Sequence, residues 1–251
     1  MPFLDHLEEL RWRILYSLIA LVVGSIIGFL VVVEFDVLAL LIAPVEPYLP
    51  EGKKLVYLSP ADPFFLTLKL AVLLGFLLAL PVLVYQIWAF VAPALHRDER
   101  RVIVPAFYLG LLLFVAGAAL AYYAALPVTL KFFTSFQTGS LEPNLVVGPY
   151  LALVVRMLLA FGAVFELPIV VLILSAFGVV DPAMLRSKRR HAIVVFAVLA
   201  SIITPGDVVI LTLFLMVPLL LLYELSIGLS SMMERRRVRL NRQMLAEAAD
   251  A

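Results

Sequence analysis

The sequence has no cysteine and few charged residues. Without cysteine among its 251 residues, the chain can form no disulfide and hold no thiolate nucleophile, iron–sulfur cluster or cysteine-ligated zinc. Charged residues make up 15% of the chain, against about 25% in an average soluble domain. Three histidines, His6, His96 and His191, lie far apart and lack the paired spacing of a histidine metal site, so we expect no metal.

Apolar residues instead make up 64% of the chain, which is more than a soluble fold of this length can bury. About 20 apolar residues are needed to cross a hydrocarbon core of about 30 Å. The apolar runs predict an all-α, polytopic membrane protein with six transmembrane helices, at residues 12–33, 64–90, 102–126, 150–177, 192–203 and 208–227.

The last two predicted spans are short, because the turn-forming residues 204–207 separate them. The alternative for this pair is a buried or re-entrant hairpin. We assign residues 1–230 to one transmembrane domain and residues 231–251 to a basic tail.

Lysine and arginine alternate between the segments that join these spans. They concentrate before the first span, in the second and fourth connections and in the tail, whereas the other connections hold only Lys53, Lys54 and Lys131. The positive-inside rule therefore predicts that both termini are cytoplasmic. The connection at 34–63 carries five prolines, which favours a fixed extracytoplasmic cap, formed together with residues 126–149.

Prolines also fall inside the predicted spans, at Pro81, Pro105, Pro168 and Pro218. Each removes a backbone hydrogen bond and bends its helix. We therefore expect a curved bundle with a concave face.

Two carboxylates are candidates for binding on the cytoplasmic side. Asp5 and Glu8 fit a helix-capping pair, which leaves Glu9 free to meet a ligand, although a solvated carboxylate in the first turn of a helix is the simpler alternative. Glu99 lies in the short second connection, where neutralisation of Arg97 and Arg100 is the alternative. Together, Glu9 and Glu99 could bind a dibasic ligand through charge-assisted hydrogen bonds.

Glu166 lies deep within the fourth predicted span, where a carboxyl group costs at least about 2.5–3.5 kcal/mol. We expect a functional role for it, with a neutral hydrogen bond to another helix as the alternative. Asp207 follows Pro205 and Gly206 within the turn, where it is a candidate functional residue, with an N-cap for the sixth span as the alternative. Glu224 is expected to meet the basic connections. No catalytic motif or nucleotide-binding loop is present, so we expect no enzyme.

In their order along the chain, several short stretches resemble the TatC family, the multi-spanning receptor of the twin-arginine protein translocase. These stretches are residues 6–11 (HLEELR), 59–60 with 63–64, 85–95 (YQIWAFVAPAL), 99–101, 161–162 with 165–168 (FELP), 204–205 with 207, and 222–224. The family commonly has two prolines after the threonine of the turn, whereas this chain has Pro205 and Gly206.

The resemblance implies a role for particular residues. Glu9 and Glu99 match the carboxylates that bind the two arginines of a signal peptide, and Arg11 and Phe90 match positions linked to the same recognition. Glu166 matches a glutamate where single-span partners of the TatA and TatB type dock. Pro44, Pro81, Pro205 and Asp207 match positions needed for the receptor's structure or function.

The resemblance also implies a non-enzymatic receptor, without a cofactor, in the cytoplasmic (inner) membrane. Such a receptor exports folded proteins by means of the proton-motive force, contacts lipid and further copies of itself, and binds no nucleic acid. The residues leave two other functions open. A proton-coupled solute transporter would use Glu166, but no internal repeat is evident. An intramembrane enzyme would need a second catalytic group beside it.

Overall fold

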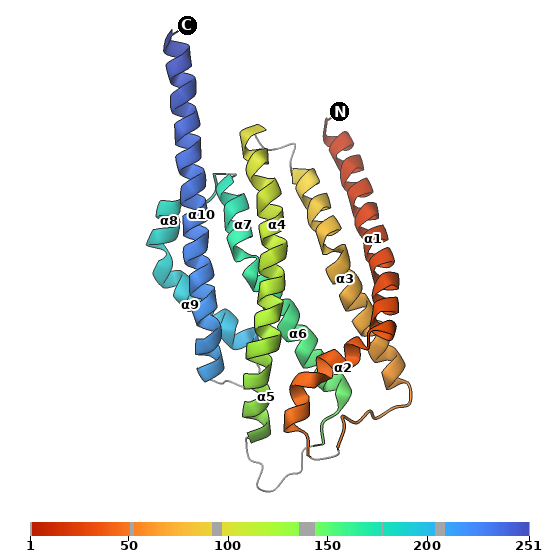
Figure 1. Cartoon of the computed structure of the whole chain (residues 1–251). Coiled ribbons are helices and arrows are strands. Elements are labelled where there is room, and N and C mark those ends of the chain that lie inside the picture. The colour runs from red at the N-terminus through yellow and green to blue at the C-terminus, as the bar shows by residue number, and fades with distance from the viewer. Residues whose placement is uncertain are drawn as a thin grey trace. The chain divides into compact units, whose positions relative to one another are not determined.

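The computed structural model describes residues 2–50, 53–91, 97–135, 144–176, 178–203 and 209–250 (Figure 1). The chain folds as two compact units, Met1–Ala94 with Ala118–Leu159, and Leu95–Gly117 with Ala160–Ala251. The long helices are α1 (Pro2–Glu34), α3 (Asp62–Val91), α4 (Arg97–Leu120), α6 (Val147–Phe165), α9 (Arg189–Ile203) and α10 (Val209–Asp250). The shorter ones are α2 (Val37–Ile42), η1 (Ala43–Tyr48), η3 (Ala121–Ala125), α5 (Leu126–Ser135), α7 (Leu167–Ala176) and α8 (Pro182–Ser187).

The all-α membrane architecture predicted from the sequence is confirmed. Five stretches of the described helices are long and apolar enough to cross a membrane: His6–Glu34, Asp62–Ile87, Tyr108–Ser135, Val147–Ser175 and Leu215–Met232. The fifth predicted span lies in α9, whose 15 residues extend about 22 Å at about 1.5 Å per residue. This is too short for an unthinned hydrocarbon core, as expected from the sequence.

Helices α1 and α3 lie side by side in the first unit (Figure 1). Their backbones approach closely where both helices carry small residues. A Cβ atom added to Gly24 would lie 2.5 Å from the carbonyl oxygen of Gly75, and one added to Gly28 would lie 2.9 Å from the amide nitrogen of Gly75. Gly24 and Gly28 are four residues apart, and small residues at this spacing commonly allow membrane helices to pack closely.

The N-terminal part of α1 differs from the prediction. Helix α1 begins at Pro2 and continues without interruption to Glu34. Asp5 therefore lies inside the helix, and its predicted role as an N-cap was wrong. The polar N-terminal segment and the apolar span are therefore one continuous helix, which carries Glu9.

The two predicted outer connections contact each other through backbone hydrogen bonds. Val56 donates to Leu145 (3.0 Å), Val147 donates to Val56 (2.9 Å), and Val56 and Val146 form a parallel bridge. Tyrosine hydroxyls add to this cap: Tyr150 donates to the Leu41 carbonyl (2.7 Å) and Tyr48 to that of Pro127 (3.2 Å). The described parts of both connections are thus joined to each other by hydrogen bonds, as expected for a cap that they form together, and its extracytoplasmic side stays a prediction.

The third predicted span continues further than expected. Residues 121–125 form the π-helical turn η3, and the helix then extends through α5 to Ser135 rather than ending at residue 126. Pro127 has no N–H group to bond the carbonyl four residues earlier. The chain accommodates this through the wider turn, in which Leu126 donates to Ala121.

In the second unit, α7, α8 and α9 pack against α10. Ser175 and Ser230 share a hydrogen bond of 2.8 Å, and Tyr223 donates to the Leu185 carbonyl at 2.8 Å. Arg189 donates to Glu224 at 2.8 Å, which confirms that Glu224 meets a basic connection. Helix α10 continues to Asp250, so residues 231–250 of the predicted tail extend a transmembrane helix.

Candidate functional site

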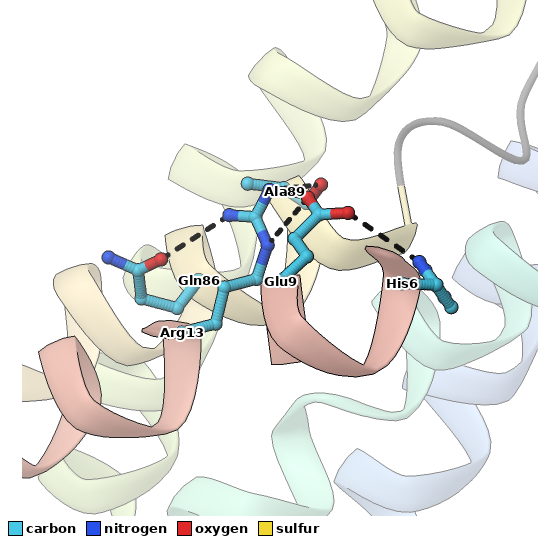
Figure 2. A network of polar contacts seen from close by, with 5 residues as sticks. All are labelled: His6, Glu9, Arg13, Gln86 and Ala89. Carbon is cyan, nitrogen blue, oxygen red and sulfur yellow. Dashed lines mark hydrogen bonds and ion pairs between the residues drawn. The ribbon is translucent and has the colours of Figure 1, made fainter. Parts of the chain in front are cut away.

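Glu9 is the centre of a polar network that joins α1 to the end of α3 (Figure 2). Its Oε1 accepts a hydrogen bond of 3.0 Å from Nε of Arg13, one turn along α1, and a second, very short one from Nη2 of the same guanidinium. Arg13 also donates to the Ala89 carbonyl (3.0 Å) and to Oε1 of Gln86 (3.4 Å). The Glu9 carboxylate is therefore held by a cation that is itself anchored to α3.

The second oxygen of Glu9 faces a weaker partner. Its Oε2 lies 3.5 Å from Nδ1 of His6, which carries a charge only when it is protonated. The His6 ring stacks on Phe90, with ring centroids 4.4 Å apart and an interplanar angle of 15°. The Glu9 side chain is 34% exposed, against 22% for Arg13. Among the described residues, Oε2 thus has no partner besides His6.

Two other residues were predicted for this site, Arg11 and Glu99. Arg11 is exposed on α1. Glu99 lies in the first turn of α4, which belongs to the second compact unit, so its proximity to Glu9 stays a prediction.

Glu166 lies where the fourth predicted span is interrupted, between α6 and α7. The interruption follows from Pro168, which cannot donate to the carbonyl of Val164. The Glu166 amide instead donates to Ala163 (3.2 Å), in a tighter turn. The Glu166 side chain is partly buried, and its Oε2 lies so close to Gly110 of α4 that a Cβ atom added there would be 2.8 Å away.

The predicted prolines have different settings. Pro44 is the second residue of the 3₁₀ helix η1 of the cap, and Pro81 lies inside α3, which continues through it as one helix. Pro205 and Asp207 lie outside the described residues.

Arg13, Gln86 and His6 were not predicted from the sequence as members of the Glu9 network. A signal for Arg13 was present, because a glutamate four residues before an arginine on a helix favours an ion pair. No local signal exists for Gln86, which is 73 residues away from Arg13. Its contact depends on how α1 and α3 pack.

These features define a polytopic helical membrane protein whose polar site is a carboxylate already engaged with a guanidinium. Comparison with known proteins identifies the family. The family model for TatC, the Sec-independent protein translocase protein, matches residues 5–218. The chain is 39% identical over 240 residues to the TatC protein of Aquifex aeolicus (strain VF5), covering 94% of this chain and 98% of that protein. It is 36% identical over 231 residues to that of Escherichia coli (strain K12), covering 91% and 88%.

Solved structures agree with this assignment. A crystal structure of the twin-arginine translocase receptor TatC matches with a TM-score of 0.73 at 39% identity, covering 90% of this chain and 98% of that chain. A second, in DDM, matches with a TM-score of 0.74 at 38% identity. The chain belongs to the TatC family. It is therefore a multi-pass membrane component of a Sec-independent protein translocase, not an enzyme, and it acts with protein partners.

Proposed function

We propose that this chain is the receptor for twin-arginine signal peptides and the core of a translocase that exports folded proteins. Both termini face the cytoplasm, and the protein lies in the cytoplasmic membrane. Transport is driven by the proton-motive force, without a bound cofactor. The arginine distribution of the sequence supports this orientation.

The observation that carries the proposal is the state of Glu9. Its carboxylate accepts two hydrogen bonds from one guanidinium, and among the described residues its second oxygen has His6 as its partner, at 3.5 Å. The site therefore suits the planar, multidentate donor that arginine presents and lysine does not. Arg11 on α1 and Phe90 on α3, whose ring stacks on His6, take part in the same recognition, and Glu99 supplies the second acidic group of the site.

The other predicted residues take roles around this site. TatA and TatB type single-span proteins dock at Glu166, and copies of the receptor associate in the membrane. Pro44 and Pro81 fix the cap and the course of α3, while Pro205 and Asp207 form a functional outer turn.

Binding of a labelled twin-arginine peptide to the full chain in lipid nanodiscs tests the receptor role. Glu9→Gln and Glu99→Gln keep the size of each side chain and remove its charge. Each should weaken binding at least about tenfold, because a hydrogen bond to a charged group contributes about 1.5–3 kcal/mol. Fluorescence anisotropy gives the dissociation constant.

Glu46→Gln is the matched control, because Glu46 is an exposed carboxylate in η1 of the cap. This variant should bind as the unmodified chain does. A double variant at Glu9 and Glu99 that binds the twin-arginine peptide with full affinity would overturn the assignment of the site.

A further inference from the structure

Arg13 makes more polar contacts than any predicted site residue does in the described part of the chain. Its guanidinium reaches both Glu9 on its own helix and two acceptors near the end of α3, the Ala89 carbonyl and the Gln86 side chain (Figure 2). Its side chain is 22% exposed. A side chain held at several points loses most of its rotamer freedom, so Arg13 is a fixed element of the site.

The contacts of Arg13 divide the Glu9 carboxylate into two unlike oxygens. Oε1 receives both hydrogen bonds from Arg13, whereas Oε2 receives none from it. The hydrogen bonds from Arg13 to Ala89 and Gln86 do not involve Glu9. Binding of a ligand to Glu9 therefore does not require Arg13 to release them. Arg13 therefore sets the plane of the Glu9 carboxylate and can stay in place when a ligand binds.

We propose that Arg13 is a positioning residue that orients the Glu9 carboxylate and thereby sets the preference for a guanidinium over an ammonium ligand. This inference rests on the proposed receptor function. A guanidinium donates in a fixed plane and needs a correctly turned carboxylate, whereas an ammonium is a compact charge with freely rotating donors. Loss of orientation therefore weakens arginine binding far more than lysine binding.

The direction in which peptide affinity changes when Arg13 is replaced distinguishes this role from a simple charge effect. Removing Arg13 removes a positive charge beside Glu9, and electrostatics alone would then strengthen the binding of any cationic peptide. A positioning role gives the opposite result for the twin-arginine peptide. An internal competitor that merely occupies Glu9 would likewise give tighter binding when it is removed.

The experiment compares a twin-arginine peptide with its twin-lysine counterpart on the full chain in nanodiscs. Arg13→Gln should weaken twin-arginine binding about tenfold, the effect of losing one well-directed charged contact. Twin-lysine binding should change by less than about threefold, so that selectivity falls. Arg13→Lys, which restores the charge but not the planar guanidinium, should recover part of the affinity. In a Glu9→Gln background, Arg13→Gln should have no further effect, because Arg13 acts through Glu9.

Arg190→Gln removes an exposed arginine of the second unit and serves as the control for net charge. Unchanged or tighter twin-arginine binding by Arg13→Gln overturns the positioning role. An equal fold-loss for both peptides, or additivity with Glu9→Gln, overturns it too, because that points to a general structural effect. If Glu9→Gln itself leaves binding intact, the proposed receptor site fails instead, so the two failures are distinguishable.

Discussion

At the scale of single residues, Glu166 and Gly110 form a pair that can be separated by mutation. A methyl group at Gly110 would lie 2.8 Å from Oε2 of Glu166, the flexible end of that side chain. Gly110→Ala should therefore displace the carboxyl group while the protein remains folded. Because we propose that Glu166 docks single-span partners, both Gly110→Ala and Glu166→Gln should reduce partner crosslinking. A photocrosslinker at Val170, which is 48% exposed and one turn further along, measures this.

Gly228→Ala is the matched control, because an added Cβ there meets nothing within 4 Å. Its crosslinking should equal that of the unmodified chain. Full crosslinking in both Gly110→Ala and Glu166→Gln would contradict a docking role. Proton-driven solute uptake by purified protein, lost in Glu166→Gln, would favour a transporter instead.

The Glu9 site shows what residue patterns predict and what they do not. Its topological position and acidic character singled out Glu9, and the structure places it in a polar network. Its carboxylate was predicted to be free to meet a ligand, whereas Arg13 donates hydrogen bonds to it. The helical spacing of these two residues was readable, but the anchors of Arg13 on Gln86 and Ala89 depend on tertiary packing.

At the scale of elements, the close approach of α1 and α3 depends on glycine. A Cβ atom at residue 24 would lie 2.5 Å from the Gly75 carbonyl oxygen, and a backbone atom cannot give way as a side chain can. Gly24→Ala should force the helices apart and destabilise the protein by about 1–3 kcal/mol, the usual effect of overpacking. Thermal unfolding in detergent measures the change.

Gly148→Ala is the control for this prediction, because Gly148 lies in the first turn of α6 and an added Cβ meets nothing within 4 Å. Its unfolding temperature should be unchanged or slightly raised, since alanine favours a helix more than glycine does. Equal unfolding temperatures for the two variants would show that α1 and α3 tolerate a wider separation.

Element boundaries were harder to predict than element existence. Apolar length located the spans, but proline signals were ambiguous about their ends. The third span was predicted to end at residue 126, before Pro127, yet the helix widens into a π turn and continues. Pro81 leaves α3 as one helix, whereas the chain is interrupted at Glu166, before Pro168. Whether a proline ends a helix depends on which neighbours satisfy the freed carbonyl, and that is a tertiary property.

At the scale of the whole molecule, composition and motif order sufficed to predict a helical membrane protein of the TatC family. The number of crossings depends on α9, because its 15 residues are fewer than a span normally needs. Positive charges precede and follow the α9–α10 pair, at 186–190 and 235–242. They favour a pair that enters the membrane from the cytoplasmic side and returns to that side. A full crossing and a re-entrant hairpin both satisfy this charge pattern.

Because the chain has no cysteine, single introduced cysteines can decide between these arrangements. A cysteine at either of the exposed positions Glu46 and Lys131 should react with a membrane-impermeant maleimide only from the outer side. A cysteine at Arg190 or Arg235, which are also exposed, should react only from the cytoplasmic side. Cysteine in place of Gly206 should react from outside if α9 crosses the membrane and the bilayer thins around it. If the cysteine at residue 206 does not react from the outer side, while those at 190 and 235 still react from the cytoplasmic side, α9 and α10 form a re-entrant hairpin.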